Sequence, residues 1–202
     1  EGGVAKGAYG VSATATITGT STGLLELNFY LGGKYIINDR AKPFWFALPS
    51  DYFVDGPYRL EVEARMNDGF VSARTGVNIT LQNGVTTPRV NTKTFTPSLG
   101  APGAGEPLTV AATGDGAGSY PGNYQVSTLI VNSQPDIFLY LGDVYERGTP
   151  TEYHNWYGLR DNLYGRLRDI TNPTVGNHEY LTTGAAGYFD YWDNIPHYYS
   201  YN

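Results

Sequence analysis

Three short motifs in the second half of the chain each place a metal-binding type of side chain directly after a glycine. They are Gly114-Asp115, Gly142-Asp143 and Gly176-Asn177-His178-Glu179. Each motif follows an apolar run that predicts a buried strand, over residues 108–113, 136–141 and 173–175. Carboxylate, amide and imidazole groups suit hard or borderline divalent and trivalent cations. Three strand ends that meet at one edge of a sheet therefore predict a metal site.

The chemistry that such a site could perform is hydrolysis of a phosphate ester. Two ions about 3.5–4 Å apart can share a carboxylate and activate a bridging water. A phosphate ester needs a nucleophile opposite its leaving group and positive charge on the developing oxyanion. The glycines allow the backbone to approach the ions closely.

The pattern around these motifs predicts an α/β region over residues 106–202. One helix is expected over residues 123–134, ended by Pro135. A second begins at a capping box formed by Thr149 and Glu152 and carries apolar residues at helical spacing as far as Leu167. The resulting β-α-β-α-β order predicts a mostly parallel sheet with ligands at the carboxyl ends of its strands.

The first half of the chain predicts an all-β domain over residues 11–82. Residues 1–10 are glycine-rich and are expected to be flexible. The region over 83–105 is rich in glycine and proline and predicts a linker, with enough alternation over 86–96 for one strand. The short alternating strands that favour a β-sandwich are expected over 11–18, 25–31, 34–37, 43–46, 58–64 and 72–81.

Composition excludes several classes of function. The net charge is −6 and the chain has no cysteine, so we expect no nucleic-acid-binding face, no disulfide and no thiolate site. No apolar run is long enough to cross a bilayer. The chain starts at Glu1 without a methionine or a visible signal peptide, so we expect it to be processed or trimmed there.

Several turns and strands of the first half resemble a bacterial Ig-like module. They lie at residues 29–33, 43–44, 55–60 and 77–81. The resemblance implies an Ig-like β-sandwich that acts as a spacer or binding unit. Self-association or a cell-surface partner could involve this domain.

The ordered set Gly-Asp, Gly-Asp and Gly-Asn-His-Glu resembles the calcineurin-like metallophosphoesterases, including the purple acid phosphatases. Residues 184–191 and 198–202 are similar to the secreted bacterial branch. The resemblance implies the front half of a metallophosphoesterase β-sandwich fold and two ions, with iron, zinc or manganese left open. Carried over, Asp115 binds the first ion, Asp143 bridges both, and the Asn177 side-chain oxygen binds the second. His178 would lie near the substrate phosphate as an orienting donor or general acid, while Glu179 supports its turn.

Two positions depart from the family pattern. Ala117 stands where the common motif has a histidine ligand, and Tyr145 is assigned as a replacement ligand of the kind that purple acid phosphatases use. The later Gly-His-x-His turn is missing, so we expect the chain to be truncated within the phosphoesterase domain. His154 is expected to be solvated, His197 to pack in an aromatic loop, and the aromatic residues of 188–201 to serve core or interface packing.

Two functions remain from these observations. The first is metal-dependent hydrolysis of phosphate mono- or diesters by a secreted protein with an Ig-like domain. The alternative is an extracellular structural or assembly protein, such as a filament or surface protein, that carries an incomplete and inactive phosphoesterase fold. Metal content discriminates between the two.

Overall fold

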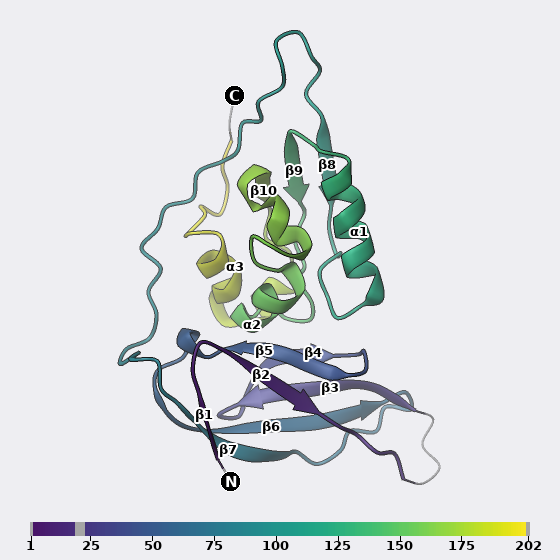
Figure 1. Ribbon diagram of the computed structural model, residues 1–202, viewed down its shortest axis with the longest axis vertical. Helices are drawn as coiled ribbons and strands as arrows, with labels where there is room; N and C mark the ends of the chain where they lie inside the picture. Colours follow the sequence, from purple (N-terminus) through teal and green to yellow (C-terminus); the bar gives the residue numbers. More distant parts are fainter. Residues whose placement is uncertain (1, 19–22, 201–202) are drawn as a thin grey trace. The chain divides into compact units, whose positions relative to one another are not determined.

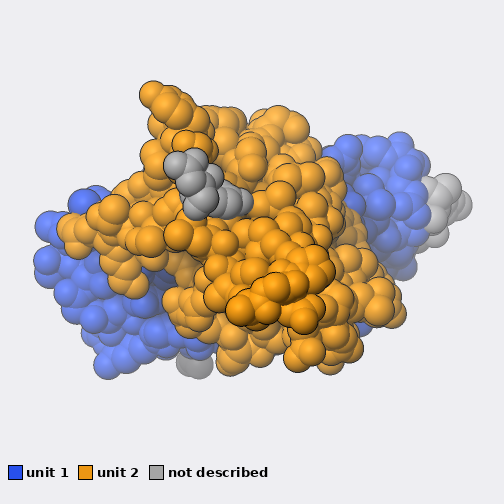
Figure 2. Space-filling view, turned by 90° about the horizontal axis from the view of Figure 1, so that it is seen from above, with its two compact units in different colours: residues 1–90 blue, residues 91–202 orange. Residues whose placement is uncertain are grey.

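The structure is a computed structural model that describes residues 2–18 and 23–200. It divides into two compact units, residues 1–90 and 91–202, which are coloured separately in Figure 2. The division falls inside the linker that the sequence predicts over 83–105. Tyr201 and Asn202, which belong to the stretch that resembles the secreted branch, lie outside the described residues.

The first unit is built from two β-sheets (Figure 1). Its strands are β1 Gly3–Ala5, β2 Ala8–Ala13, β3 Leu24–Leu31, β4 Lys34–Asp39, β5 Phe44–Pro49, β6 Gly56–Met66 and β7 Thr75–Leu81, with a short 3-10 helix at Ser50–Tyr52. One sheet has the order β1-β7-β6-β3-β4, and the other pairs β2 with β5. Neighbouring strands run antiparallel, except that β1 is parallel to β7.

Alternating apolar residues of β3 and β5 pack between these two sheets. Successive side chains of a strand point to opposite faces, so every second residue can reach the core. Phe29 of β3 meets Phe46 of β5 edge to face, with the ring centroids 4.8 Å apart. Trp45, next to Phe46 in the chain, is 53% exposed. The contact therefore joins the two sheets as layers, as the alternation predicts.

The predicted flexible segment over residues 1–10 was wrong for its described part. Strand β1 pairs with β7, and β2 starts at Ala8, so that it covers 8–13 instead of the expected 11–18. Gly7 is held at both ends, because its N–H donates to Asn83 Oδ1 at 2.7 Å and its carbonyl accepts from the Ser50 N–H at 2.9 Å. Backbone pairing of this kind does not need large side chains, which is why glycine-rich composition misled the prediction.

The carboxylate of Asp55 fastens the end of β7 to the loop before β6. It accepts hydrogen bonds from the Asn83 N–H at 2.8 and 2.9 Å and from the Gly84 N–H at 2.6 Å. These bonds favour the charged form and lower the pKa of Asp55 below its ordinary value. A carboxyl whose pKa is lower when folded contributes stability above its unfolded pKa and loses it as the pH falls through the folded pKa.

Replacing Asp55 by asparagine should flatten the acid limb of the stability profile. We expect the melting temperature of the unsubstituted chain to fall more steeply below about pH 4, the ordinary range for aspartate. The Asp55→Asn variant should be less stable at neutral pH and less sensitive to acid. Calorimetry across the acid range measures both quantities. Parallel profiles for the two chains would contradict the proposed role of these hydrogen bonds.

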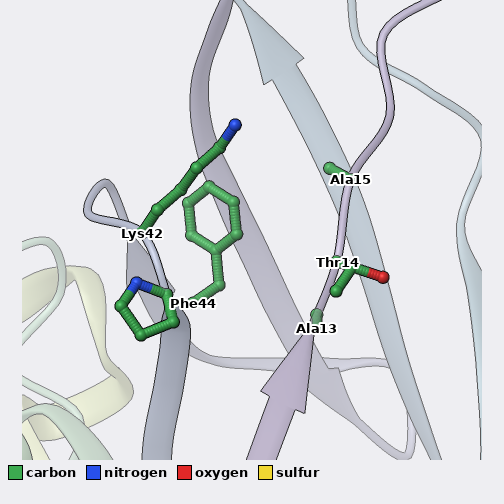
Figure 3. A pocket seen from close by; sticks show the side chains of 6 residues that line it. Ala13, Thr14, Ala15, Lys42 and Phe44 are labelled. Atoms are coloured by element: carbon green, nitrogen blue, oxygen red, sulfur yellow. The ribbon is translucent and has the colours of Figure 1, made fainter.

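A hollow of about 490 Å³ opens in the first unit where β2 ends. Figure 3 shows Lys42 and Phe44 on one side of it and residues 13–15 on the other. The lining is mostly apolar, with one ammonium group from Lys42. The residues that line it include no carboxylate and no histidine. A binding partner of the first unit stays a prediction.

Residues 82–109 form neither a helix nor a strand, so the strand expected within 86–96 is absent from this described stretch. Side chains tie part of it to the second unit instead. Asn91 Nδ2 donates to the Asp190 carbonyl at 2.7 Å. Ser98 and Asn172 exchange two hydrogen bonds, of 2.8 and 2.7 Å. Residues from Asn91 onward therefore belong structurally to the second unit.

The second unit contains a three-stranded parallel sheet in the order β10-β9-β8. This confirms the predicted parallel sheet and its first crossover helix, α1, between β8 and β9. The elements of the second unit are β8 Val110–Thr113, α1 Pro121–Asn132, β9 Ile137–Tyr140, α2 Pro150–Glu152, a π-helical turn Tyr153–Tyr157, a 3-10 helix Leu163–Ile170, β10 Thr171–Pro173, 3-10 turns Glu179–Leu181 and Thr183–Ala185, and α3 Ala186–Tyr191.

No described helix is long and apolar enough to cross a membrane.

Two predicted strands differ from the structure. The strand expected to be buried over 108–113 is the edge strand β8, and Leu108 and Val110 are 45% and 49% exposed. Strand β10 covers 171–173 instead of 173–175. An apolar run predicts that a strand forms. How exposed the strand is depends on which elements pack against it, and the run itself does not contain that information.

The helix expected from Thr149 to Leu167 is broken into several pieces. Its capping box is confirmed, because Thr149 Oγ1 accepts from the Glu152 N–H and Glu152 accepts from the Thr149 N–H. The chain leaves the helix at Gly158, which has φ 95°. Asn162 Oδ1 then accepts from the Leu159 N–H at 2.6 Å. The turn therefore forms in place of a continued helix, because glycine adopts a positive φ easily and the asparagine side chain satisfies a backbone N–H. A prediction from the spacing of apolar residues does not take these two effects into account.

Candidate metal centre

The three motifs lie in turns that follow the three parallel strands of the second unit. We define the first turn as residues 114–117, the second turn as 142–145 and the third turn as 176–179. The first turn follows β8 directly, the second follows β9 after Leu141, and the third follows β10 after two further residues. Because the strands are parallel, their carboxyl ends share one edge of the sheet.

Backbone hydrogen bonds join the first turn to the second. The Asp115 N–H donates to the Gly142 carbonyl at 3.1 Å, and the Tyr145 N–H donates to the Ala117 carbonyl at 2.8 Å. Ala117 and Val144 also form an isolated parallel bridge. The structure therefore brings the predicted Asp115 and Asp143 into adjoining turns.

Both aspartates adopt left-handed backbone conformations, with φ 57° at Asp115 and φ 64° at Asp143. This region is uncommon for residues other than glycine, although aspartate is enriched there. Asp115 is exposed, whereas Asp143 is 8% exposed. The same local bend thus presents one carboxylate at the surface and one in a nearly buried position.

The second and third turns approach too closely for any side chain at two glycines. A Cβ at Gly142 would lie 2.4 Å from the Gly176 nitrogen. A Cβ at Gly176 would lie 2.1 Å from Asp143 Oδ1. Gly142 and Gly176 are therefore required by the close approach of the second and third turns, whereas the sequence predicted that the glycines would let the backbone approach the ions.

The buried side chain of Glu179 links the second and third turns. Its side chain is 0% exposed. Oε1 accepts from the Val144 N–H at 2.7 Å and from the Tyr153 hydroxyl at 3.1 Å. Oε2 accepts from the Asp143 N–H at 3.1 Å and from the Gly176 N–H at 2.9 Å. Glu179 thus supports the turns, the role that the family resemblance implied.

Tyr145 contacts the first aspartate as a hydrogen-bond donor. Its hydroxyl donates to Asp115 Oδ1. Burial, followed by this hydrogen bond and the charge of Asp115, raises the pKa of Tyr145 well above its ordinary value. The phenol therefore stays protonated beside Asp115. Its position next to the predicted ligand agrees with the assignment to the site, while metal ligation by Tyr145 stays a prediction.

His178 is oriented by three contacts. Its backbone N–H donates to Asp143 Oδ1 at 2.9 Å. Its ring Nδ1 lies 2.7 Å from the Glu146 carbonyl oxygen, which can only accept, so Nδ1 carries a proton. The ring also packs against Tyr145, with the centroids 4.4 Å apart. The other ring nitrogen, Nε2, can therefore contact a substrate. It can donate a hydrogen bond only when both ring nitrogens carry a proton.

The candidate ligands are oxygen donors, the type that a hard cation prefers, but they are few in number. Two carboxylates, the Asn177 amide and the Tyr145 phenol all offer oxygen, which Mn²⁺ and similar ions accept. Asn177 is exposed in the third turn. Within residues 2–18 and 23–200, no group of three or more His, Cys, Asp or Glu side chains is placed to hold a metal ion. Ala117, at the position of the usual histidine, is buried and provides no ligand.

The other two histidines and the aromatic stretch near the end of the chain differ in how deeply they are buried. His154 is half-buried instead of solvated, because the helix around it continues as a buried π-helical turn. His197 is exposed, and its ring lies 4.8 Å from that of Phe189. In the aromatic stretch, Tyr188 and Trp192 are buried in the core of the second unit, whereas Tyr198 is 91% exposed.

Sequence reasoning missed Tyr140, whose hydroxyl lies between the first and second turns. It accepts from the Ala117 N–H and donates to the Asp143 carbonyl, both at 3.1 Å. One signal was present, since Tyr140 ends an otherwise apolar strand three residues before Asp143. A buried phenol usually finds a hydrogen-bond partner, and the nearest polar groups in the sequence are those of the turn.

Two solved structures show a distant likeness to this chain. Fibronectin(III)-like modules of Clostridium thermocellum CbhA are 24% identical over 44% of this chain and 92% of theirs, with a TM-score of 0.33. The Clostridium perfringens spore cortex lytic enzyme SleM is 14% identical over 37% of this chain and 27% of its own, with a TM-score of 0.28. Neither likeness is close enough to define the fold of this chain.

The chain has no significant match among curated proteins. The family model of the calcineurin-like phosphoesterases, in contrast, matches residues 108–202. That stretch contains all three turns and every residue assigned to the metal site. Residues 108–202 are thus similar to the calcineurin-like phosphoesterase family, which points to phosphoester hydrolysis as a class of reaction.

Proposed function

We propose that the second unit hydrolyses phosphate mono- or diesters with the help of two bound ions, of iron, zinc or manganese. The observation that carries the proposal is the meeting of the three turns at one sheet edge. There Asp115 contacts Tyr145 and Asp143 contacts His178. The family match over 108–202 supports phosphate esters as the substrate class.

The roles of the residues follow from their donors and their surroundings. The carboxylates of Asp115 and Asp143 and the side-chain oxygen of Asn177 would hold the ions. Bound ions would supply Lewis-acid chemistry by stabilising negative charge on the phosphoryl group and acidifying water. His178 Nε2, with its ring fixed by Glu146, would donate a hydrogen bond or a proton to a substrate oxygen. Tyr145 would orient Asp115.

Asp143→Asn tests this proposal with little disturbance of the fold. The asparagine oxygen can still accept from the His178 N–H, while the charge is lost. We expect hydrolysis of p-nitrophenyl phosphate or bis(p-nitrophenyl) phosphate to fall by about a hundredfold or more, the scale typical of electrostatic catalytic groups. Asp161→Asn, at an exposed position of the same unit, is the matched control and should keep full activity.

Elemental analysis of the purified chain decides the alternative. Near two equivalents of transition metal and hydrolysis abolished by Asp143→Asn would support the enzyme. A chain that holds no metal and hydrolyses neither ester would contradict it. That outcome would favour the extracellular assembly role, with the Ig-like domain as the site of self-association. Extracellular location belongs to the proposal and rests on the resemblance to the secreted branch.

A further inference from the structure

Tyr140 occupies a position from which it can control the spacing of the two candidate metal-binding carboxylates. It is the last residue of β9 and is 1% exposed. Its hydroxyl accepts from the Ala117 N–H in the first turn and donates to the Asp143 carbonyl in the second, each at 3.1 Å. One oxygen atom therefore joins the residue two positions after Asp115 to Asp143 itself.

Only a hydroxyl can make both contacts from this position. A hydroxyl group donates one hydrogen bond and accepts others, whereas a phenylalanine ring would leave a buried N–H and a buried C=O without this partner. Neighbouring rings hold the phenol in place. The ring of Tyr157 lies 4.8 Å from that of Tyr140 and the ring of Tyr164 lies 5.5 Å away, between centroids. The Tyr140 ring is thus held by two aromatic neighbours, and the hydroxyl of one of them, Tyr164, also lies against Gly116 of the first turn.

We propose that Tyr140 is a positioning residue that sets the separation of Asp115 and Asp143, and hence of the two ions. This inference rests on the proposed function. Glu179 performs the corresponding task for the second and third turns. Tyr140 completes the set by fixing the first turn, which Glu179 does not touch through any of its four hydrogen bonds.

Tyr140→Phe separates positioning from general stability when the readout is metal binding. The full chain, stripped of metal, is titrated with Mn²⁺ by calorimetry, and the spin coupling between bound ions is followed by electron paramagnetic resonance. We expect the affinity for the second Mn²⁺ to fall about 10–100-fold, the usual effect of losing a group that orients ligands. The coupled spectrum of an ion pair should give way to signals of isolated Mn²⁺.

Tyr164→Phe is the matched control. Its hydroxyl is also buried, lies against Gly116 of the first turn and has no hydrogen-bond partner among the described residues. Its removal should leave Mn²⁺ affinity and spin coupling unchanged. Hydrogen exchange of the Ala117 amide provides a metal-free readout, because it should accelerate in Tyr140→Phe and not in Tyr164→Phe.

The outcomes are distinct. If the unsubstituted chain binds no Mn²⁺, the proposed function fails, and this inference fails with it. If it binds two ions and Tyr140→Phe binds them with the same affinity and coupling, this inference alone is overturned. A Tyr140→Phe chain that does not fold would also overturn it, since Tyr140 would then be a residue of the core and not a positioning residue.

Discussion

The Glu179→Gln variant should lose about 2–6 kcal/mol of unfolding free energy from the second unit. Each carboxylate oxygen accepts two hydrogen bonds. Glutamine replaces one of these oxygens by an NH₂ group, so two buried donors face another donor at about 1–3 kcal/mol each. Glu179 is fully buried, and water cannot replace the lost acceptor. Urea unfolding followed by the fluorescence of Trp156 and Trp192 measures this loss.

Tyr153→Phe provides a graded comparison for Glu179→Gln. It removes only the hydroxyl that donates to Glu179 Oε1 and leaves the three backbone donors in place. Its cost should be about 0.5–1.5 kcal/mol, the net value of one hydrogen bond. Equal losses in the two variants would show that the backbone donors of the second and third turns do not depend on the carboxylate. The structural account of Glu179 would then be wrong.

The local features of the site were predictable from the sequence, whereas the side chains that hold its turns together were not. The capping box at Thr149 and Glu152 and the turns that begin at Gly114, Gly142 and Gly176 are written within a few consecutive residues. Glu179, in contrast, reaches Val144 across 35 positions. Which buried donors will surround a carboxylate depends on how strands and turns pack, and spacing along the chain does not contain that information.

The same distinction explains the errors in the fold. Alternation correctly located β3, but the pairing of residues 3–5 with β7 depends on a partner more than seventy residues away. Apolar spacing predicted a single helix after Thr149, since it does not weigh the turn at Gly158. Exposure of β8 followed from its edge position, which composition does not reveal. Features that depend on a few consecutive residues could be predicted from the sequence, whereas pairing between distant residues could not.

Replacing Gly176 by alanine should disrupt the candidate metal centre by steric contact alone. The backbone of Gly176 lies outside the left-handed region, so alanine is allowed by its own conformation. The added methyl group would nevertheless lie 2.1 Å from Asp143 Oδ1 and 2.6 Å from the Asp143 nitrogen. Contacts below 3 Å cannot be absorbed by a side-chain rotation when one of the atoms is backbone, so the second and third turns must separate.

A separation of about 1 Å is enough to lower catalysis about a hundredfold when reacting groups must be aligned. We therefore expect Gly176→Ala to lose ester hydrolysis to that extent and to bind Mn²⁺ more weakly. Gly122→Ala is the matched control, because a Cβ at Gly122 in helix α1 meets nothing within 4 Å. It should keep activity and gain up to about 1 kcal/mol from the better helix propensity of alanine. Unchanged hydrolysis and Mn²⁺ affinity in Gly176→Ala would show that the two turns need not touch, and the close approach would then have no part in building the site.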